Sequence, residues 1–204
     1  MARIRVAAVV PTYMEEARIG WCLGFLKPHL DYILVVDDRS TDRTVEVASH
    51  YADQVIVKEP SHNQAETRNF GIECLPHGYD WTLHVDADEK FDEYFLRTIH
   101  TVPELDPMVD GFQFPRVNLP DARDWPDYQV RFIRNIPEIR WKGHPHDKPY
   151  KGEVPLIELG TVTIISSPII HLPRRTDIQR PWWRGDDQAR ERLMTWRKKN
   201  QPEQ

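Results

Sequence analysis

The chain has 204 residues and a formal net charge of −5, with 40% hydrophobic and 29% charged residues. This length allows one domain with a substantial core plus an appendage, and the composition is that of a globular protein. The negative charge argues against a uniformly basic nucleic-acid-binding surface, and no apolar run in the sequence is long enough to span a bilayer.

The start of the sequence and its cysteine content indicate a reducing environment. The first residues lead into a strand pattern without the apolar core and cleavage site of a secretory signal. Cys22 and Cys74 are the only two cysteines, which is too few for a disulfide framework. We therefore expect a cytoplasmic protein without a transmembrane segment.

The first hundred residues alternate between strand and helix patterns. Apolar runs predict strands at 4–10, 32–36, 55–57 and 81–85, and Pro11 is expected to end the first of them. Helical spacing predicts helices at 15–26, around 45–52 and at 63–75. The alternation is typical of an α/β protein with a doubly wound, mostly parallel sheet.

The character of the chain changes after residue 100. Thirteen of the seventeen prolines follow this point, which disfavours long helices, and strands are predicted at 111–115, 128–133 and 161–165. Residues 173–204 contain nine Lys or Arg, five acidic residues and three tryptophans, with helical spacing at 186–199. We interpret this tail as an appendage for self-association or for docking a partner.

Polar clusters follow three of the predicted strands, at 11–16, 37–40 and 86–89. Ligands of doubly wound sheets bind beyond the carboxyl ends of the strands, so one crevice is expected to collect all three clusters. Asp86 and Asp88 project to the same side, where like charges favour a bound divalent cation. The alternative is that these carboxylates cap the next helix. The first strand is not followed by a Gly-rich dinucleotide or phosphate-binding motif.

Four segments in order, 9–16, 35–42, 65–71 and 86–89, resemble the signatures of family 2 glycosyltransferases with the GT-A fold. The chain departs from the family pattern at Met14, where Asn is usual, and at Arg39, where Gly is usual. The resemblance implies one domain at 1–172, with a Rossmann-like nucleotide-sugar-binding half at 1–100 and a mixed acceptor half at 101–172.

The same resemblance assigns residues to the nucleotide. The assigned positions are Pro11, Tyr13, Glu15, Asp37, Asp38, Arg68, Asn69 and Asp86. Tyr13 would stack on the base while Asp38, with or without Asp37, accepts a hydrogen bond from it. The guanidinium of Arg68 would suit a diphosphate. The alternatives are that Tyr13 packs at a strand end and that Arg68 lies on a solvated helix face.

The resemblance also implies a metal site. Asp86 and Asp88 would bind Mn²⁺ or Mg²⁺, which bridges the donor diphosphate. His171 is a candidate further ligand, although a histidine after an apolar strand can be purely structural. Glu89 either faces the acceptor as a catalytic residue or caps a helix that starts near Asp92.

The general base is expected in the loop-forming segment 141–149, which contains glycine, prolines and histidines. Similar transferases carry a His-Glu pair in this region, and His146-Asp147 resembles a version one methylene shorter. Our hypothesis is that Asp147 deprotonates the acceptor hydroxyl. The alternatives are a surface pair of Asp147 with Lys148, or a base role for His144, His146 or Glu89.

These observations predict a metal-dependent inverting glycosyltransferase. It would move a sugar from a nucleotide-sugar donor, a UDP-sugar by preference, to a hydroxyl of a glycan, a protein or a modified nucleic-acid base. One alternative is an inactive nucleotide- or glycan-binding module. Another is a sugar-phosphate nucleotidyltransferase, for which a glycine-rich loop after the first strand would be expected.

Overall fold

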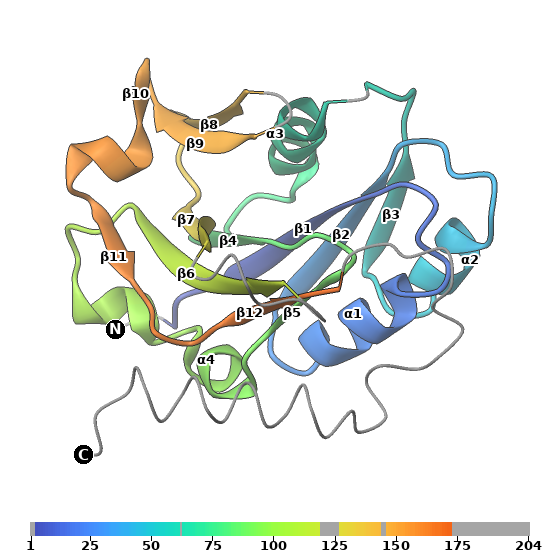
Figure 1. Cartoon of the computed structure of the whole chain (residues 1–204), viewed down its shortest axis with the longest axis horizontal. Helices are drawn as coiled ribbons and strands as arrows, with labels where there is room; N and C mark the ends of the chain where they lie inside the picture. Colours follow the sequence, from blue (N-terminus) through green and yellow to red (C-terminus); the bar gives the residue numbers. More distant parts are fainter. Residues whose placement is uncertain (1–2, 62, 119–126, 144–145, 173–204) are drawn as a thin grey trace.

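The computed structural model describes residues 3–61, 63–118, 127–143 and 146–172 (Figure 1). The predicted appendage at 173–204, with its helix at 186–199, lies outside the described residues. Within the described part of the chain, no helix is long and apolar enough to cross a membrane.

Among the described residues, nine strands form one sheet at the centre of the fold. Its first part contains four parallel strands in the order β3-β2-β1-β4. These are β3 (Gln54–Val57), β2 (Tyr32–Asp37), β1 (Val6–Thr12) and β4 (Trp81–His84). Strand order reverses between β1 and β4, which is where ligands bind in such sheets.

The second part of the sheet is mixed. It continues from β4 through β7 (Asp127–Arg134), β6 (Gly111–Asn118), β12 (Ile169–His171) and β5 (Glu89–Phe91), with β11 (Val162–Ile164) also paired to β6. β7 is antiparallel to both β4 and β6, while β12 is parallel to β6 and antiparallel to β5. The predicted α/β class, with a mostly parallel first half and a mixed second half, is confirmed.

Helices cover both faces of the sheet (Figure 1). α1 (Ile19–Leu26), α2 (Thr44–Ala48) and α4 (Glu93–Thr98) lie on one face, and α3 (Gln64–Cys74) lies on the other. Alternate residues of β1 serve the two faces, since Ala8 packs on the α1 side and Val9 on the α3 side. A side chain at Gly71 of α3 would meet Val9 Cγ1 at 2.4 Å, so glycine permits this close packing.

Several predicted boundaries are wrong, among them that of the helix around 45–52, which ends at Ala48, and two next to the site. β1 continues through Pro11 to Thr12, because β4 pairs with β1 only as far as Val9 and the missing N–H of Pro11 faces the side where β4 has ended. The helix predicted from residue 15 begins at Ile19 instead. Before it, Glu15 forms a turn in which its carbonyl accepts from the N–H groups of both Arg18 and Ile19 at 2.9 Å.

A second, three-stranded sheet packs beside α3 (Figure 1). It contains β8 (Ile139–Lys142), β9 (Lys148–Lys151) and β10 (Val154–Pro155), followed by a 3₁₀ turn at Leu156–Leu159. Another 3₁₀ turn, Val102–Leu105, follows α4. The core of the small sheet joins Trp141 and Leu156 to Ala65 of α3 and Ile133 of β7. The sequence did not predict this sheet.

Candidate active site

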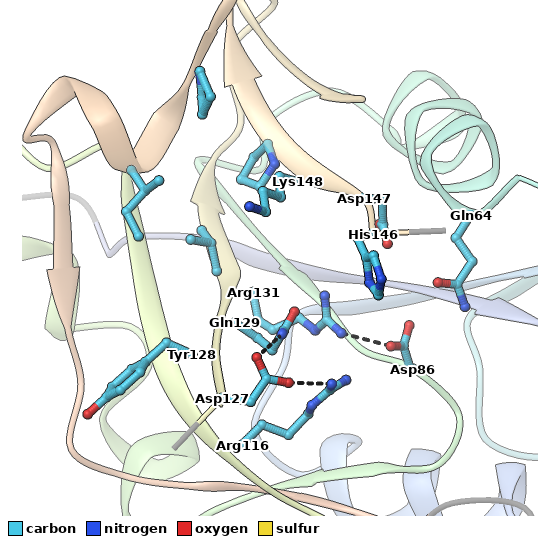
Figure 2. A pocket seen from close by; sticks show the side chains of 14 residues that line it. Gln64, Asp86, Arg116, Asp127, Tyr128, Gln129, Arg131, His146, Asp147 and Lys148 are labelled. Atoms are coloured by element: carbon cyan, nitrogen blue, oxygen red, sulfur yellow. Dashed lines mark hydrogen bonds and ion pairs between the residues drawn. The ribbon is translucent and has the colours of Figure 1, made fainter. Parts of the chain in front are cut away.

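Two cavities meet at the edge where the parallel strands end. The strand-end cavity, of about 400 Å³, lies beyond β1, β2 and β4. The β7 cavity, of about 450 Å³, lies between β7 and the small sheet (Figure 2). Gln64, Asp86 and Arg116 line both cavities, so the two form adjoining parts of one site.

The strand-end cavity contains most of the residues that the sequence assigned to a nucleotide and a metal. Its lining includes Pro11, Tyr13, Glu15, Asp38, Asp86, Asp88 and His171. Tyr13 is 47% exposed and lines this cavity, which favours a ligand contact over packing at a strand end. The predicted convergence of three polar clusters at one edge is therefore observed in the fold.

The neighbouring carboxylates Asp37 and Asp38 do different things. Asp37 is fully buried and accepts from the Ser40 N–H at 2.7 Å and the Ser40 hydroxyl at 2.6 Å, so it shapes its own loop. Asp38 lines the cavity, where Lys58 Nζ donates to it at 2.9 Å and Thr67 Oγ1 at 3.2 Å. Of the two, Asp38 is the one placed for ligand binding.

The two departures from the family pattern occupy strained backbone positions. Met14 has φ of 57° and Arg39 has φ of 62°, in the left-handed region that Asn and Gly adopt more easily. The loops remain tied together despite these residues, because the Met14 N–H donates to Ser40 Oγ at 2.8 Å. Thr41 also donates to the Met14 sulfur at 3.4 Å. The loop geometry therefore survives both substitutions.

The predicted metal ligands fit a divalent cation in part. Asp88 Oδ2 lies 3.4 Å from His171 Nε2, and both side chains are partly exposed to the same cavity. A carboxylate and an imidazole suit Mn²⁺, and a cation that also binds substrate phosphates needs few protein ligands. The described residues contain no group of three His, Cys, Asp or Glu placed to hold a metal ion.

Asp86 is engaged differently from Asp88. Its Oδ1 accepts from Arg68 Nη2 at 2.5 Å and its Oδ2 from Arg131 Nη2 at 2.8 Å. Burial would raise the pKa of Asp86, but the charges of Arg68 and Arg131 lower it more, so its pKa lies well below the ordinary value. Both oxygens of Asp86 therefore hold guanidinium groups at hydrogen-bond distance, whereas the guanidinium beside Asp88, that of Arg18, lies 3.6 Å from its Oδ2.

Glu89 belongs to the same buried ionic cluster. It lies in β5 with 1% exposure, and Arg131 donates to both of its carboxylate oxygens. Burial raises its pKa against the opposing effect of Arg131. The alternative that Glu89 caps the next helix is wrong, because the side chain of Asp92 caps α4 at the Tyr94 N–H. Glu89 lines neither cavity, and its catalytic role stays a prediction.

Asp147 lines the β7 cavity beside His146 (Figure 2). Its Oδ2 accepts from Arg68 Nε at 2.6 Å, and its side chain is 8% exposed. The proposed surface pair with Lys148 is therefore wrong. His144, another candidate base, lies outside the described residues.

Arg68 and Asn69 lie on α3 but line neither cavity. Arg68 has no exposed surface, so the solvated-face alternative is wrong. The Asn69 side chain donates to the Trp141 carbonyl and accepts from the Trp141 N–H, both at 2.8 Å. Contact of these two residues with a nucleotide stays a prediction, and their observed contacts are to the protein.

Sequence reasoning did not single out Arg116, which lines both cavities, or Arg131, which contacts Asp86 and Glu89. Arg131 is 3% exposed and lies on the face of β7 opposite Phe132. Arg116 pairs with Asp127 and lies 3.9 Å from Glu89. The available signal was the position of Arg131 directly before the apolar residues Phe132 and Ile133, because a charged residue in a buried segment requires a charged partner.

Comparison with known proteins identifies the family. The family model described as Glycosyl transferase family 2 matches residues 7–164. The chain belongs to this family. Glycosyltransferases described as uncharacterized, from Rickettsia typhi and Rickettsia prowazekii, are each 34% identical over 89 residues. The match covers 44% of this chain and 30% of either relative, so it spans under a third of their length.

Solved structures show that the fold is GT-A. Mannosyl-3-phosphoglycerate synthase from Rubrobacter xylanophilus has a TM-score of 0.61 at 15% identity, over 98% of this chain and 77% of that one. Glucosyl-3-phosphoglycerate synthase from Mycobacterium tuberculosis, in complex with Mn²⁺, UDP and phosphoglyceric acid, has a TM-score of 0.61 at 14% identity. That alignment covers 86% of this chain and 73% of the other.

Proposed function

We propose that this family 2 member is a metal-dependent inverting glycosyltransferase that moves a sugar from a UDP-sugar to an acceptor hydroxyl. The observation that carries the proposal is the meeting of the two cavities at Asp86, Arg116 and Gln64. The strand-end cavity takes the donor and the β7 cavity takes the acceptor, so the anomeric carbon and the attacking hydroxyl meet at this junction.

The donor side supplies groups that recognise a nucleoside. Exposed Tyr13 offers an aromatic face to the base, and Asp38 offers acceptor oxygens to its N–H groups. Pro11 and Glu15 complete the wall beside them. The Mycobacterium tuberculosis structure of the same fold contains UDP and Mn²⁺, which supports a UDP-sugar as the donor.

Asp88 and His171 would hold the divalent cation, with Asp86 fixed behind them by two arginines. When bound, the cation neutralises the charge that develops on the leaving diphosphate. The fixed carboxylate of Asp86, which lies at the junction, keeps the guanidinium groups of Arg68 and Arg131 in place beside it.

The acceptor side supplies the base. Asp147 faces the β7 cavity, where its carboxylate accepts the proton of the acceptor hydroxyl during attack on the anomeric carbon. Attack from the acceptor cavity, opposite the leaving diphosphate in the donor cavity, inverts the configuration of that carbon. A glycan, a protein side chain or a modified nucleic-acid base can each supply such a hydroxyl. A cytoplasmic location and a docking role for residues 173–204 stay predictions.

The test is UDP release by the purified protein from a panel of UDP-sugars, with Mn²⁺ or with a chelator. We expect at least one UDP-sugar to be turned over and to raise the unfolding temperature only when the metal is present. Binding of UDP without release from any donor would support the inactive module instead. Release of pyrophosphate from UTP and a sugar phosphate would support the nucleotidyltransferase.

A further inference from the structure

Three consecutive residues of α3 contact three separate parts of the site. Thr67 donates to Asp38 of the strand-end cavity, and the Asn69 side chain is paired with the Trp141 backbone of β8. Between them, Arg68 contacts Asp86 on one side and Asp147 on the other. One short helical segment therefore joins the proposed donor side to the proposed acceptor side.

The contacts of Arg68 differ from those of a surface ion pair. Its guanidinium has no exposed surface and donates to Asp147 through Nε at 2.6 Å and to Asp86 through Nη2 at 2.5 Å. The planar fork of the guanidinium fixes the directions of these two bonds, so it also fixes the spacing of the two carboxylates. The positive charge of Arg68 also offsets the repulsion between the carboxylates of Asp86 and Asp147.

The guanidinium is itself held in place. It lies over the ring of Trp141 at 4.8 Å from the ring centroid, and the Trp141 indole N–H donates to His84 Nε2 at 3.2 Å. This hydrogen bond fixes the ring that supports Arg68.

We propose that Arg68 is a positioning residue that sets the reach of Asp147 toward the acceptor hydroxyl, and not a nucleotide ligand. The proposal rests on the proposed transferase function. Among the described residues, Arg68 pairs with Oδ2 of Asp147 and leaves Oδ1 for the hydroxyl. The short Asp147 side chain lines the β7 cavity while the long Arg68 side chain holds its Oδ2.

The test is a length-compensation experiment with Arg68→Lys, Asp147→Glu and the double variant. A lysine keeps the charge but replaces the fork with a single ammonium near the guanidinium carbon, so both carboxylates become more distant. The extra methylene of glutamate restores the reach. With the UDP-sugar that wild-type protein turns over fastest, we expect each single variant to lower the rate of UDP release about 100-fold.

The double variant should release UDP at least about tenfold faster than either single variant. The affinity for UDP with Mn²⁺ should stay within about twofold of wild type in all three proteins. A purely structural role would not produce recovery in turnover at constant UDP affinity. Wild-type turnover in Arg68→Lys, or a double variant no faster than the slower single variant, would overturn the proposal. Arg97→Lys, at an exposed pair with Glu93, controls for the substitution itself.

Two further measurements cover the cases in which the main experiment fails. If Arg68→Lys does not fold, Trp141→Leu removes the ring beneath Arg68 and leaves both charged partners in place. Turnover should then fall about tenfold at unchanged UDP affinity, and unchanged turnover would overturn the proposal. If wild-type protein turns over no UDP-sugar, the proposed function fails. The Arg68–Asp147 pairing is then tested by stability. The loss of unfolding free energy in the double variant should be smaller than the sum of the losses in the two single variants.

Discussion

The donor and acceptor sides of this site are built by different kinds of contact. On the donor side the loops after β1 and β2 are held by bonds within a loop and between the two loops. Asp37 bonds to Ser40 three residues away, and the Met14 N–H to Ser40 26 residues away. On the acceptor side Asp147 is held by Arg68, 79 residues earlier in the chain, and Trp141 by Asn69, 72 residues earlier. The comparison teaches that contacts between segments nearer in sequence hold the donor-side loops, whereas contacts of longer range hold the acceptor side.

The largest expected effect tests whether the metal belongs to the donor side. Asp88→Asn should lower sugar transfer by roughly three orders of magnitude and abolish Mn²⁺-dependent UDP binding, because the cation loses its carboxylate ligand. Calorimetry of UDP binding with and without Mn²⁺ measures the second effect. Asp106→Asn, an exposed turn carboxylate, is the control. Unchanged metal dependence in Asp88→Asn would remove Asp88 from the metal site.

The second prediction separates Asp86 from Asp88 by stability. Asp86→Ala should destabilise the protein by roughly 3 kcal/mol, because it leaves the buried guanidinium groups of Arg68 and Arg131 partly uncompensated. Asp88→Ala should change stability by under about 0.5 kcal/mol. Urea unfolding of the two variants measures the difference. If the main effect of either substitution were to relieve repulsion between the two carboxylates, neither variant would lose stability. Equal stabilities of the two variants would support that alternative.

The Asp86 effect should also depend on pH. The folded-state pKa of Asp86 is lowered, so its stabilisation is present above its ordinary pKa of 3.8 and is lost as pH falls through the lowered pKa. The stability gap between wild type and Asp86→Asn should therefore shrink in urea unfolding as pH drops below that value. A gap that widens on acidification would contradict the assignment.

The third prediction tests the acceptor side directly. Asp147→Asn should lower turnover by about 100-fold at nearly unchanged UDP affinity, as expected when a general base is lost. His146→Gln is the matched variant, because His146 lies beside Asp147 in the same cavity. If His146→Gln loses turnover and Asp147→Asn does not, the role of base passes to His146.

A smaller effect is expected for base recognition on the donor side. Asp38→Ala should weaken UDP binding about tenfold with the metal dependence intact, since a hydrogen bond to a charged group contributes roughly 1.5 kcal/mol. Calorimetry at saturating Mn²⁺ measures this. Glu59→Ala, in the exposed pair with Arg39, is the control and should have no effect on affinity.

The smallest expected effect concerns the strained loop on the donor side. Arg39→Gly should stabilise the protein by about 0.5 kcal/mol, because glycine relieves the positive φ but adds freedom to the unfolded chain. Arg39→Ala is the matched control, since it removes the same side chain and keeps the strain. Thermal unfolding measures both variants. If Arg39→Ala is as stable as Arg39→Gly, relief of backbone strain is not the cause of the stabilisation.

Much of the first half was predictable from the sequence. Strand and helix alternation gave the parallel part of the sheet, and polar residues directly after β1, β2 and β4 indicated the donor cavity. These predictions succeeded because each cluster follows a strand that the local pattern identifies. The end of β1 was predicted too early, at Pro11, because the sequence does not reveal where the neighbouring strand β4 ends.

What the sequence determined was the residue types and the order of the motifs, with Asp86 and Asp88 directly after a predicted strand. Only the tertiary structure decided that Asp86 is held by two arginines while Asp88 faces His171. It also decided that Arg68 is buried against Asp147. The physical reason is that buried charges need partners, and those partners come from strands and helices whose pairing no local pattern encodes.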